Sequence, residues 1–399
     1  MTSEASSARK QPVWFLVLFA LAAGGGAIAY VPLLTVLLPL QVAGMIGTED
    51  VPSLARITFL GAIAASLANI AFGMLSDRSA SRLPWIVTGL VGSSTLLVAI
   101  GEAQSVPLLI ALVMAWQTFL NMMLGPLLAW AGDCVPDSQK GLLGGMLAVA
   151  PAMGALSGSL VTLENIIPPD LRLVTVACLV AALVLPVVVL GRGRAQAVLR
   201  RPVVQAEVRA SAARQSRSVV ARMWLARFLV QISEAGLFAF LLFWLRSIAG
   251  DFHENTAANI FSAVLVASIP LTLAIGRWSD RNGRPILPLK LSALTAGCGL
   301  VMMALASALP LAIAGYVVFG IGASIFLALH TGQTLRVLPQ PQHRGRDLGI
   351  FNLTNTIPSI VMPWLTLALV PGFGFWALFV LFAAFAFTAS ALLVSTRKR

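Results

Sequence analysis

The sequence contains one short motif twice, as Gly73-Met-Leu-Ser76-Asp77-Arg78 and as Gly276-Arg277-Trp-Ser279-Asp280-Arg281. The two copies lie 203 residues apart, and each one follows a long run of apolar residues. A second pair of residues keeps this spacing, since Pro136 and Pro339 are also 203 residues apart. Self-similarity at a fixed spacing indicates a duplicated structural unit. The motif therefore divides the chain into two halves of similar organisation.

The composition around the motif excludes a soluble protein. Of the 399 residues 58% are hydrophobic and only 11% are charged, and the mean hydropathy is +0.90. An ordinary soluble domain carries about 25% charged residues, because its surface must face water. A soluble enzyme, a disordered protein and a coiled coil are therefore excluded, and the chain is expected to lie in a lipid bilayer.

The apolar runs predict the fold. A helix that crosses a bilayer needs about 20 mostly apolar residues. Runs of this kind lie near 13–36, 54–75, 84–103, 106–129, 142–162, 173–191, 223–247, 257–276, 285–306, 311–333, 348–368 and 374–395. The sequence thus predicts an all-α membrane protein of twelve transmembrane helices in two pseudo-symmetric six-helix bundles. The expected parts are a tail over 1–12, bundles over 13–191 and 223–395, a central loop over 192–222 and a basic tail over 396–399.

The basic residues predict the orientation. The net charge of +12 comes from 27 Lys and Arg against 15 Asp and Glu. Most of the basic residues fall in alternate loops, on the same side as the two termini. Because cytoplasmic loops carry the excess of Lys and Arg, both termini are expected in the cytoplasm. We therefore expect a multi-pass protein of the cell (inner) membrane, and no nucleic-acid partner.

No cofactor or metal site is expected. The three cysteines, Cys134, Cys178 and Cys298, lie in or beside apolar runs without the spacing of a zinc site or a disulfide framework. They are interpreted as small buried hydrophobic residues. No catalytic nucleophile with a base, no phosphate-binding loop and no ATPase domain are found, so the chain is not expected to be an enzyme.

In its topology and its repeated loop motif, the sequence resembles the major facilitator superfamily of transporters. The family motif is Gly-x-x-x-Asp-Arg-x-Gly-Arg followed by Lys or Arg. The first copy has Ala80 and Ser81 where Gly and Arg are usual, and the second ends in Pro285. The resemblance implies two helical bundles that expose a central substrate site to either side of the membrane in turn. It also implies a monomer that binds a small-molecule substrate.

The resemblance assigns a role to the motif loops. In the family, this loop is a cytoplasmic latch that holds the outward-open state. The residues that match the motif are Gly73, Asp77, Arg78, Arg82, Gly276, Asp280, Arg281, Gly283 and Arg284. Positive-inside anchoring alone would explain the arginines, but it would not explain an aspartate at the same place twice. We therefore expect these residues to form a gate at the cytoplasmic side.

Asp133 is a further gate candidate. It lies at the inner end of the fourth expected span, and the repeat spacing of 203 residues maps it onto Arg336. An acid in one half and a base at the equivalent place in the other half would suit a charge pair across the gate. Termination of the span by a solvated charge is the alternative.

Ionisable residues within a span are expensive, so each suggests a function. The seventh expected span contains Arg227, Gln231 and Glu234, which steps of four and three residues place on one helical face. Glu234 lies near the middle of the span and is the candidate for proton coupling. A structural glutamate, or one that contacts the substrate without proton transfer, is the alternative.

Several polar residues in other spans suggest a central cavity. They could contact hydroxyl groups of a substrate, or they could hold neighbouring helices together by hydrogen bonds. His330 could also titrate or simply be solvated at the end of its span. The candidates are Tyr30, Asn69, Gln117, Asn121, His330, Gln333, Asn352 and Asn355.

Three functions remain in comparison. The first is a proton-linked carrier of a small polar solute such as a sugar, which the polar cavity and the central acid favour. The second is an exporter of drugs or metabolites. The segment Ala150-Pro151-Ala-Met-Gly154 resembles the Gly-Pro-x-x-Gly motif of such antiporters without its first Gly, and this departure speaks against the second function. The third, a membrane receptor or enzyme without transport, has no residues in its favour. The substrate, the direction of flux and the choice between H⁺ and Na⁺ stay open.

Overall fold

The computed structural model describes residues 10–46, 51–79, 81–162, 167–191, 206–250, 254–337 and 343–394. Nearly all of them are helical, and no strand occurs among them, which confirms the predicted all-α class. The expected tails over 1–12 and 396–399 lie almost wholly outside the described residues.

The helices of the first half cover residues 13–190. They are α1 (Val13–Pro32), the π-helical segment η1 (Leu33–Leu37), α2 (Leu38–Ile46), α3 (Val51–Arg78), α4 (Leu83–Gly101), α5 (Val106–Cys134), α6 (Lys140–Leu147), α7 (Val149–Val161) and α8 (Arg172–Leu190), with short 3₁₀ turns η2 (Asp137–Gln139) and η3 (Pro169–Leu171). The first expected span is longer than predicted, because the helix continues past Pro32 through η1 into α2. The π-helical segment follows directly after Pro32, a residue that lacks a backbone N–H and cannot complete the α-helical ladder.

The helices of the second half cover residues 206–394. They are α10 (Ala206–Ile248), α11 (Glu254–Asn282), α12 (Ile286–Ala304), α13 (Leu309–Val337), α14 (Arg344–Phe373) and α15 (Phe375–Val394). Helix α10 begins well before its predicted start at residue 223, so the later part of the predicted central loop is helical. The segment from Ala206 is rich in Ala and Arg, which are good helix formers.

The fifth expected span is divided. Helix α6 ends at Leu147, and α7 begins at Val149 after one non-helical residue. Pro151 cannot donate a hydrogen bond to the carbonyl of Leu147, so the helical ladder breaks there. This division matters for the site, because Pro151 and Leu147 both face the central cavity described below.

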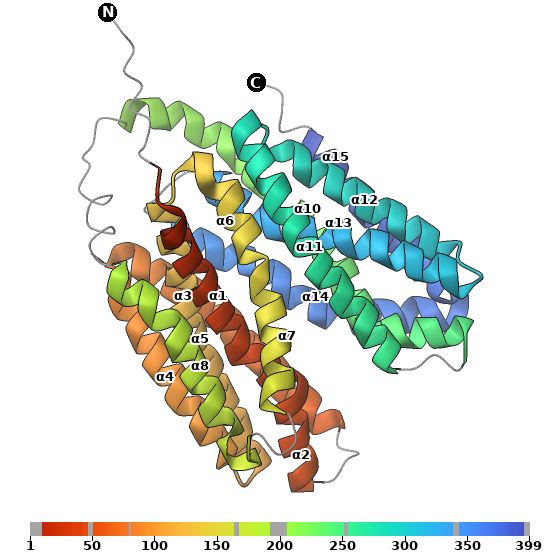
Figure 1. Cartoon of the computed structure of the whole chain (residues 1–399), viewed down its shortest axis with the longest axis horizontal. Coiled ribbons are helices and arrows are strands. Elements are labelled where there is room, and N and C mark those ends of the chain that lie inside the picture. The colour runs from red at the N-terminus through yellow and green to blue at the C-terminus, as the bar shows by residue number, and fades with distance from the viewer. Residues whose placement is uncertain are drawn as a thin grey trace, which may run out of the picture.

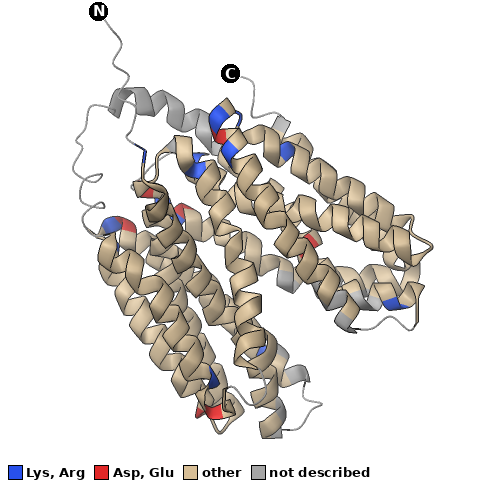
Figure 2. Ribbon diagram, viewed as in Figure 1, with Lys and Arg blue, Asp and Glu red and all other residues tan. Residues whose placement is uncertain are grey.

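Ten helical segments among the described residues are long and apolar enough to cross a membrane. The seventh and eleventh expected spans lie in α10 and α14, which contain side chains outside the description, and their crossing stays a prediction. Large apolar side chains are exposed on the outer surface, as the bilayer requires, and charged residues lie mainly near the ends of the helices (Figure 2). The interpretation of all three cysteines as buried is wrong in part: Cys134 is buried, whereas Cys178 and Cys298 are exposed.

The helices pack as two groups. In the first half, α1 packs on α7 and α8, and α5 packs on α3 and α4. In the second half, α12 packs on α13 and α15, and α10 packs on α14 and α15. The groups meet through α3 with α14 and through α6 with α11 and α13, and they diverge away from the end where α1 begins and α15 ends (Figure 1). The exact domain bounds stay a prediction.

Candidate functional site: a polar gate above a central cavity

The first copy of the motif joins the two halves through Asp77. Its carboxylate at the end of α3 accepts hydrogen bonds from the backbone N–H groups of Gly345 (2.8 Å) and Arg346 (3.0 Å) in the first turn of α14. The first N–H groups of a helix have no partner within the helix, and the helix dipole places partial positive charge there. Asp77 therefore caps a helix of the opposite half.

The second copy makes the same contact in the reverse direction. Asp280 at the end of α11 accepts hydrogen bonds from the backbone N–H groups of Gly141 (3.1 Å) and Leu142 (2.8 Å) in the first turn of α6. Each half thus supplies an aspartate to a helix N-terminus of the other half. We call this end of the molecule, where α3 and α11 end and α6 and α14 begin, the motif end.

The motif glycines permit the close approach of these helices. A Cβ atom at Gly276 would lie 2.6 Å from the carbonyl oxygen of Gly141, which is closer than real Cβ contacts allow. In the other copy, Gly73 packs in the same way against the backbone of Gly345. The helices can bring the carboxylates to the opposing N–H groups only because both positions lack side chains.

The motif glycine in the second copy allows a direct test. Gly276→Ala is expected to weaken the closed motif end, because the added methyl group meets backbone atoms that cannot move aside. A cysteine placed at Leu335, which is fully buried beside Gly132 across the gate, would then react faster with a water-soluble thiol reagent. The matched control is Gly372→Ala, since nothing lies within 4 Å of a Cβ atom there. Equal labelling in both variants would contradict the proposed tight packing.

Arginines add ion pairs to both copies. Arg82 binds Asp77 (2.8 Å) and Asp133 (2.7 Å) within the first half, and Asp133 also binds Arg344 of the second half (2.5 Å). In the second copy, Arg336 pairs with Asp280. The hypothesis of an Asp133–Arg336 pair across the gate is therefore wrong. The sequence offset aligns the two positions in the repeat, but each side chain is engaged elsewhere: Asp133 by Arg82 and Arg344, and Arg336 by Asp280.

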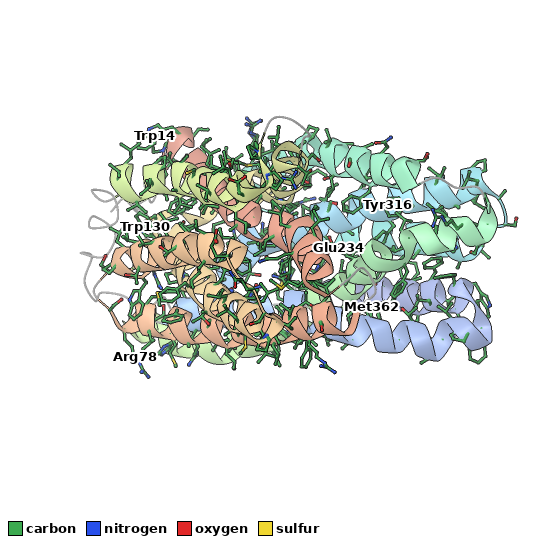
Figure 3. All side chains as sticks on the ribbon, turned by 90° about the horizontal axis from the view of Figure 1, so that it is seen from below. Trp14, Arg78, Trp130, Glu234, Tyr316 and Met362 are labelled. Atoms are coloured by element: carbon green, nitrogen blue, oxygen red, sulfur yellow. The ribbon has the colours of Figure 1, made fainter. Side chains whose placement is uncertain are left out.

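The remaining motif residues lie at the surface. Arg78, Arg281 and Arg284 are exposed at the motif end, where Figure 3 labels Arg78. Gly283 has a φ of +60°, a left-handed conformation that favours glycine, and it forms the turn between α11 and α12. These residues shape the loops and supply surface charge, while Asp77, Asp280 and Asp133 make polar contacts between the halves.

A cavity of about 310 Å³ lies between the two halves. Five of the eight predicted cavity residues line it, together with Arg227; the five are Tyr30, Asn69, Asn121, Asn352 and Asn355. Asn69 donates to Asn121 (2.9 Å), and Asn355 donates to Asn352 (2.9 Å). The sequence left open whether these amides face a cavity or form hydrogen bonds within the protein. In the structure they do both.

Three predicted residues do not line this cavity. His330 is fully buried, with its ring nitrogens bonded to the Met223 carbonyl (2.9 Å) and the Thr334 hydroxyl (3.1 Å). Gln333 is buried and accepts a hydrogen bond from Arg336 (2.9 Å), and Gln117 accepts hydrogen bonds from Asn121. Their surroundings give these three residues structural contacts, because neighbouring helices cover the faces that carry them.

Arg227 extends from α10 to two other helices. Its guanidinium donates to the Thr354 hydroxyl (3.1 Å), the Leu327 carbonyl (3.1 Å), the Thr331 hydroxyl (3.2 Å) and the Asn355 side-chain oxygen (3.2 Å). It thus links α10 to α13 and α14 at the cavity wall. All four of these acceptors belong to helices other than α10.

Glu234 lies near the middle of the molecule, between the two groups of helices (Figure 3). Its carboxylate accepts a hydrogen bond from Gln231, the neighbour predicted on the same face of α10. Both side chains are partly buried, and neither belongs to the residues that line the cavity. Arg227 of the same helix, Tyr30 of α1 and Tyr316 of α13 lie within electrostatic range of Glu234, although none of them contacts its carboxylate in an ion pair.

Sequence reasoning missed part of the cavity wall. Thr331 and Thr334 of α13 line it, as do Phe19 of α1 and Phe351 of α14. Threonines and phenylalanines are common in apolar spans, so no local pattern distinguishes those that face a cavity. The spacing of Thr331 and Thr334 on one helical face was the available signal.

Comparison with known proteins assigns the fold. Residues 223–399 match the model of the Major Facilitator Superfamily. A bacterial homologue of the iron transporter ferroportin, solved in an outward-facing state, matches with a TM-score of 0.76 and 14% identity over 98% of this chain and 100% of that chain. The Escherichia coli fucose:proton symporter matches with a TM-score of 0.72 and 15% identity, over 97% of this chain and 98% of that one.

A human organic anion transporter is also similar, with a TM-score of 0.69 and 15% identity over 96% of this chain and 100% of that chain. A comparison with curated protein sequences gave no significant match. Over the whole chain, the fold of two helical halves is similar to the folds of these solved structures. Residues 223–399 are thus similar to the Major Facilitator Superfamily, and the whole chain is similar in fold to the transporters named above.

Proposed function

We propose that this transporter carries a small polar organic solute across the cytoplasmic membrane by alternating access, coupled to protons through Glu234. One observation carries the proposal: both halves line a cavity, and reciprocal polar caps join them at one end of it. Contacts of this kind can break and re-form without unfolding a helix. With the termini in the cytoplasm, as the basic residues predict, the closed motif end faces the cytoplasm and the cavity faces outward.

The cavity wall supports a polar solute. Asparagine amides, threonine hydroxyls and the Tyr30 hydroxyl offer donors and acceptors within it. Few precisely placed polar groups in a mostly apolar pocket are typical of small-molecule sites. A monomer suffices for this function, because one chain supplies both walls.

Efflux of an apolar compound is the second candidate, since the first half contributes an apolar wall. The residues of that wall include Phe19, Leu124, Leu127, Leu128 and Leu147. An exporter could hold an apolar compound against these side chains. The two candidates differ in the solute that moves and in the direction of the accompanying proton.

Purified protein in liposomes with an imposed pH gradient separates the candidates. Labelled sugars and sugar acids are offered beside lipophilic cations, while a dye inside the vesicles records pH. Entry of a polar solute together with protons is the expected result. Movement of lipophilic cations against the proton flow would instead favour the exporter, and no protein-dependent flux of any solute would contradict the carrier.

A further inference from the structure

The cavity wall carries one charge. Among the described residues that line the cavity, Arg227 is the single charged side chain, and the others are apolar or neutral polar residues. The acceptors of Arg227 are two hydroxyls, one backbone carbonyl and one amide oxygen, all of them neutral. The positive charge therefore has hydrogen bonds but no counter-charge within contact distance.

No carboxylate of the described residues compensates this charge directly. The ion pairs in that part of the chain join arginines of the motif end to aspartates, and Arg227 takes part in none of them. Glu234 lies two helical turns further along α10, and its carboxylate bonds to Gln231 instead. Glu234 therefore acts on the guanidinium only through space, and the side of the guanidinium that faces the cavity has no carboxylate in direct contact.

A cavity whose wall carries one unpaired positive charge favours a negatively charged solute when both of its ends are closed. Water can solvate the guanidinium while one end is open, but closure removes that water. An unpaired charge in a low-dielectric site is costly, and a carboxylate that pairs with arginine removes the cost. A neutral solute would leave the charge unpaired in the closed state.

The rest of the wall complements the arginine. Thr331 and Asn355 contact the guanidinium and lie beside it in the wall, where they can also bond to an anionic head group. The apolar side chains Phe19, Leu124 and Leu128 of the first half supply a surface for a hydrocarbon or ring portion. The two halves therefore provide different chemistry for the two ends of one molecule.

We infer that the solute is a small organic anion whose carboxylate pairs with Arg227 while its body packs against the first half. The inference rests on the proposed carrier function and narrows its substrate class from polar solutes in general to carboxylates. Arginine suits this role, because its planar fork binds a carboxylate through two parallel hydrogen bonds.

The test uses matched probes and matched variants. Radiolabelled 3-phenylpropanoate is compared with 3-phenylpropanamide, and gluconate with glucose, by equilibrium binding and by uptake into proteoliposomes. The variants are Arg227→Gln, which removes the charge, and Arg227→Lys, which keeps the charge without the fork. Arg222→Gln is the control, because it removes a charge from the same helix outside the cavity lining. Gel filtration of each variant verifies that it folds.

Wild-type protein is expected to bind at least one carboxylate about tenfold more tightly than its neutral partner, a difference of about 1.4 kcal/mol. Arg227→Gln should abolish this preference, Arg227→Lys should keep part of it, and Arg222→Gln should keep all of it. The inference is overturned if a neutral probe binds as well as its carboxylate, if the preference survives in Arg227→Gln, or if no carboxylate binds. Uptake of glucose or the amide in those cases would leave the carrier function standing, and absence of all uptake would remove both.

Discussion

Substitution of Gln for Glu234 is expected to abolish concentrative uptake while exchange of labelled for unlabelled solute continues. The amide keeps the size of the side chain and can still bond to Gln231, the partner of the carboxylate in the structure. It cannot take up and release a proton, so the energy of the proton gradient can no longer drive accumulation. Binding and the conformational change, which exchange requires, do not depend on that proton.

Accumulation and exchange are measured in the same proteoliposomes, with and without a pH gradient. Accumulation above equilibrium should fall at least about tenfold, whereas the exchange rate should change less than about threefold. The matched control is Glu102→Gln, because Glu102 is exposed at the end of α4, away from the cavity. A Glu234→Gln protein that still accumulates solute against its gradient would exclude Glu234 as the coupling residue.

The double substitution Asp77→Asn with Asp280→Asn is expected to lower the turnover number more than it weakens solute binding. Each aspartate accepts hydrogen bonds from two backbone N–H groups at a helix N-terminus of the opposite half. Loss of a carboxylate charge at such a position costs about 0.3–2 kcal/mol. The closed motif end would be destabilised, while the cavity residues keep their contacts.

A cost of about 1.4 kcal/mol corresponds to tenfold in an equilibrium. Each single variant should therefore lower turnover by up to about tenfold, and the double variant by more, because the two caps share no partner. Solute KM should change less than about threefold. Initial rates over a range of solute concentrations separate the two parameters, and a cysteine at Leu335 reports how often the motif end opens.

Asp170→Asn is the control for loss of one carboxylate, since Asp170 is exposed in the turn before α8. Its turnover and labelling rate should equal those of the unsubstituted protein. Unchanged turnover in both single variants and in the double variant would remove the gate assignment for the motif aspartates.

The repeated motif predicted some features of the gate but not the partners of its aspartates. The sequence predicted Asp77 and Asp280 at one end of the molecule, because two similar loops at a fixed spacing follow equivalent helices. It did not predict that each carboxylate caps a helix of the other half. The partner of each carboxylate is a backbone N–H group, which every residue except proline possesses. No pattern of side chains in the sequence can therefore predict which N–H group it is.

The cavity residues were also only partly predictable from the sequence. Asn69, Asn121 and Asn352 were predicted from their polarity within apolar runs, and they do face the cavity. His330 had the same signal, yet it is fully buried among neighbouring helices. Periodicity places a residue on a face of its own helix, but it does not say which neighbour covers that face.

The sequence by itself determined the helical class, the duplication, the membrane setting and the equivalence of the two motif loops. These properties depend only on the composition and on the spacing of residues along the chain. Neither of them changes with the way in which the helices pack. The tertiary structure alone decided that Asp133 pairs with Arg344 rather than Arg336, and that Arg227 faces the cavity without a carboxylate beside it. Such pairings depend on the angles and offsets at which distant helices cross, because a hydrogen bond or an ion pair forms only within a few ångströms.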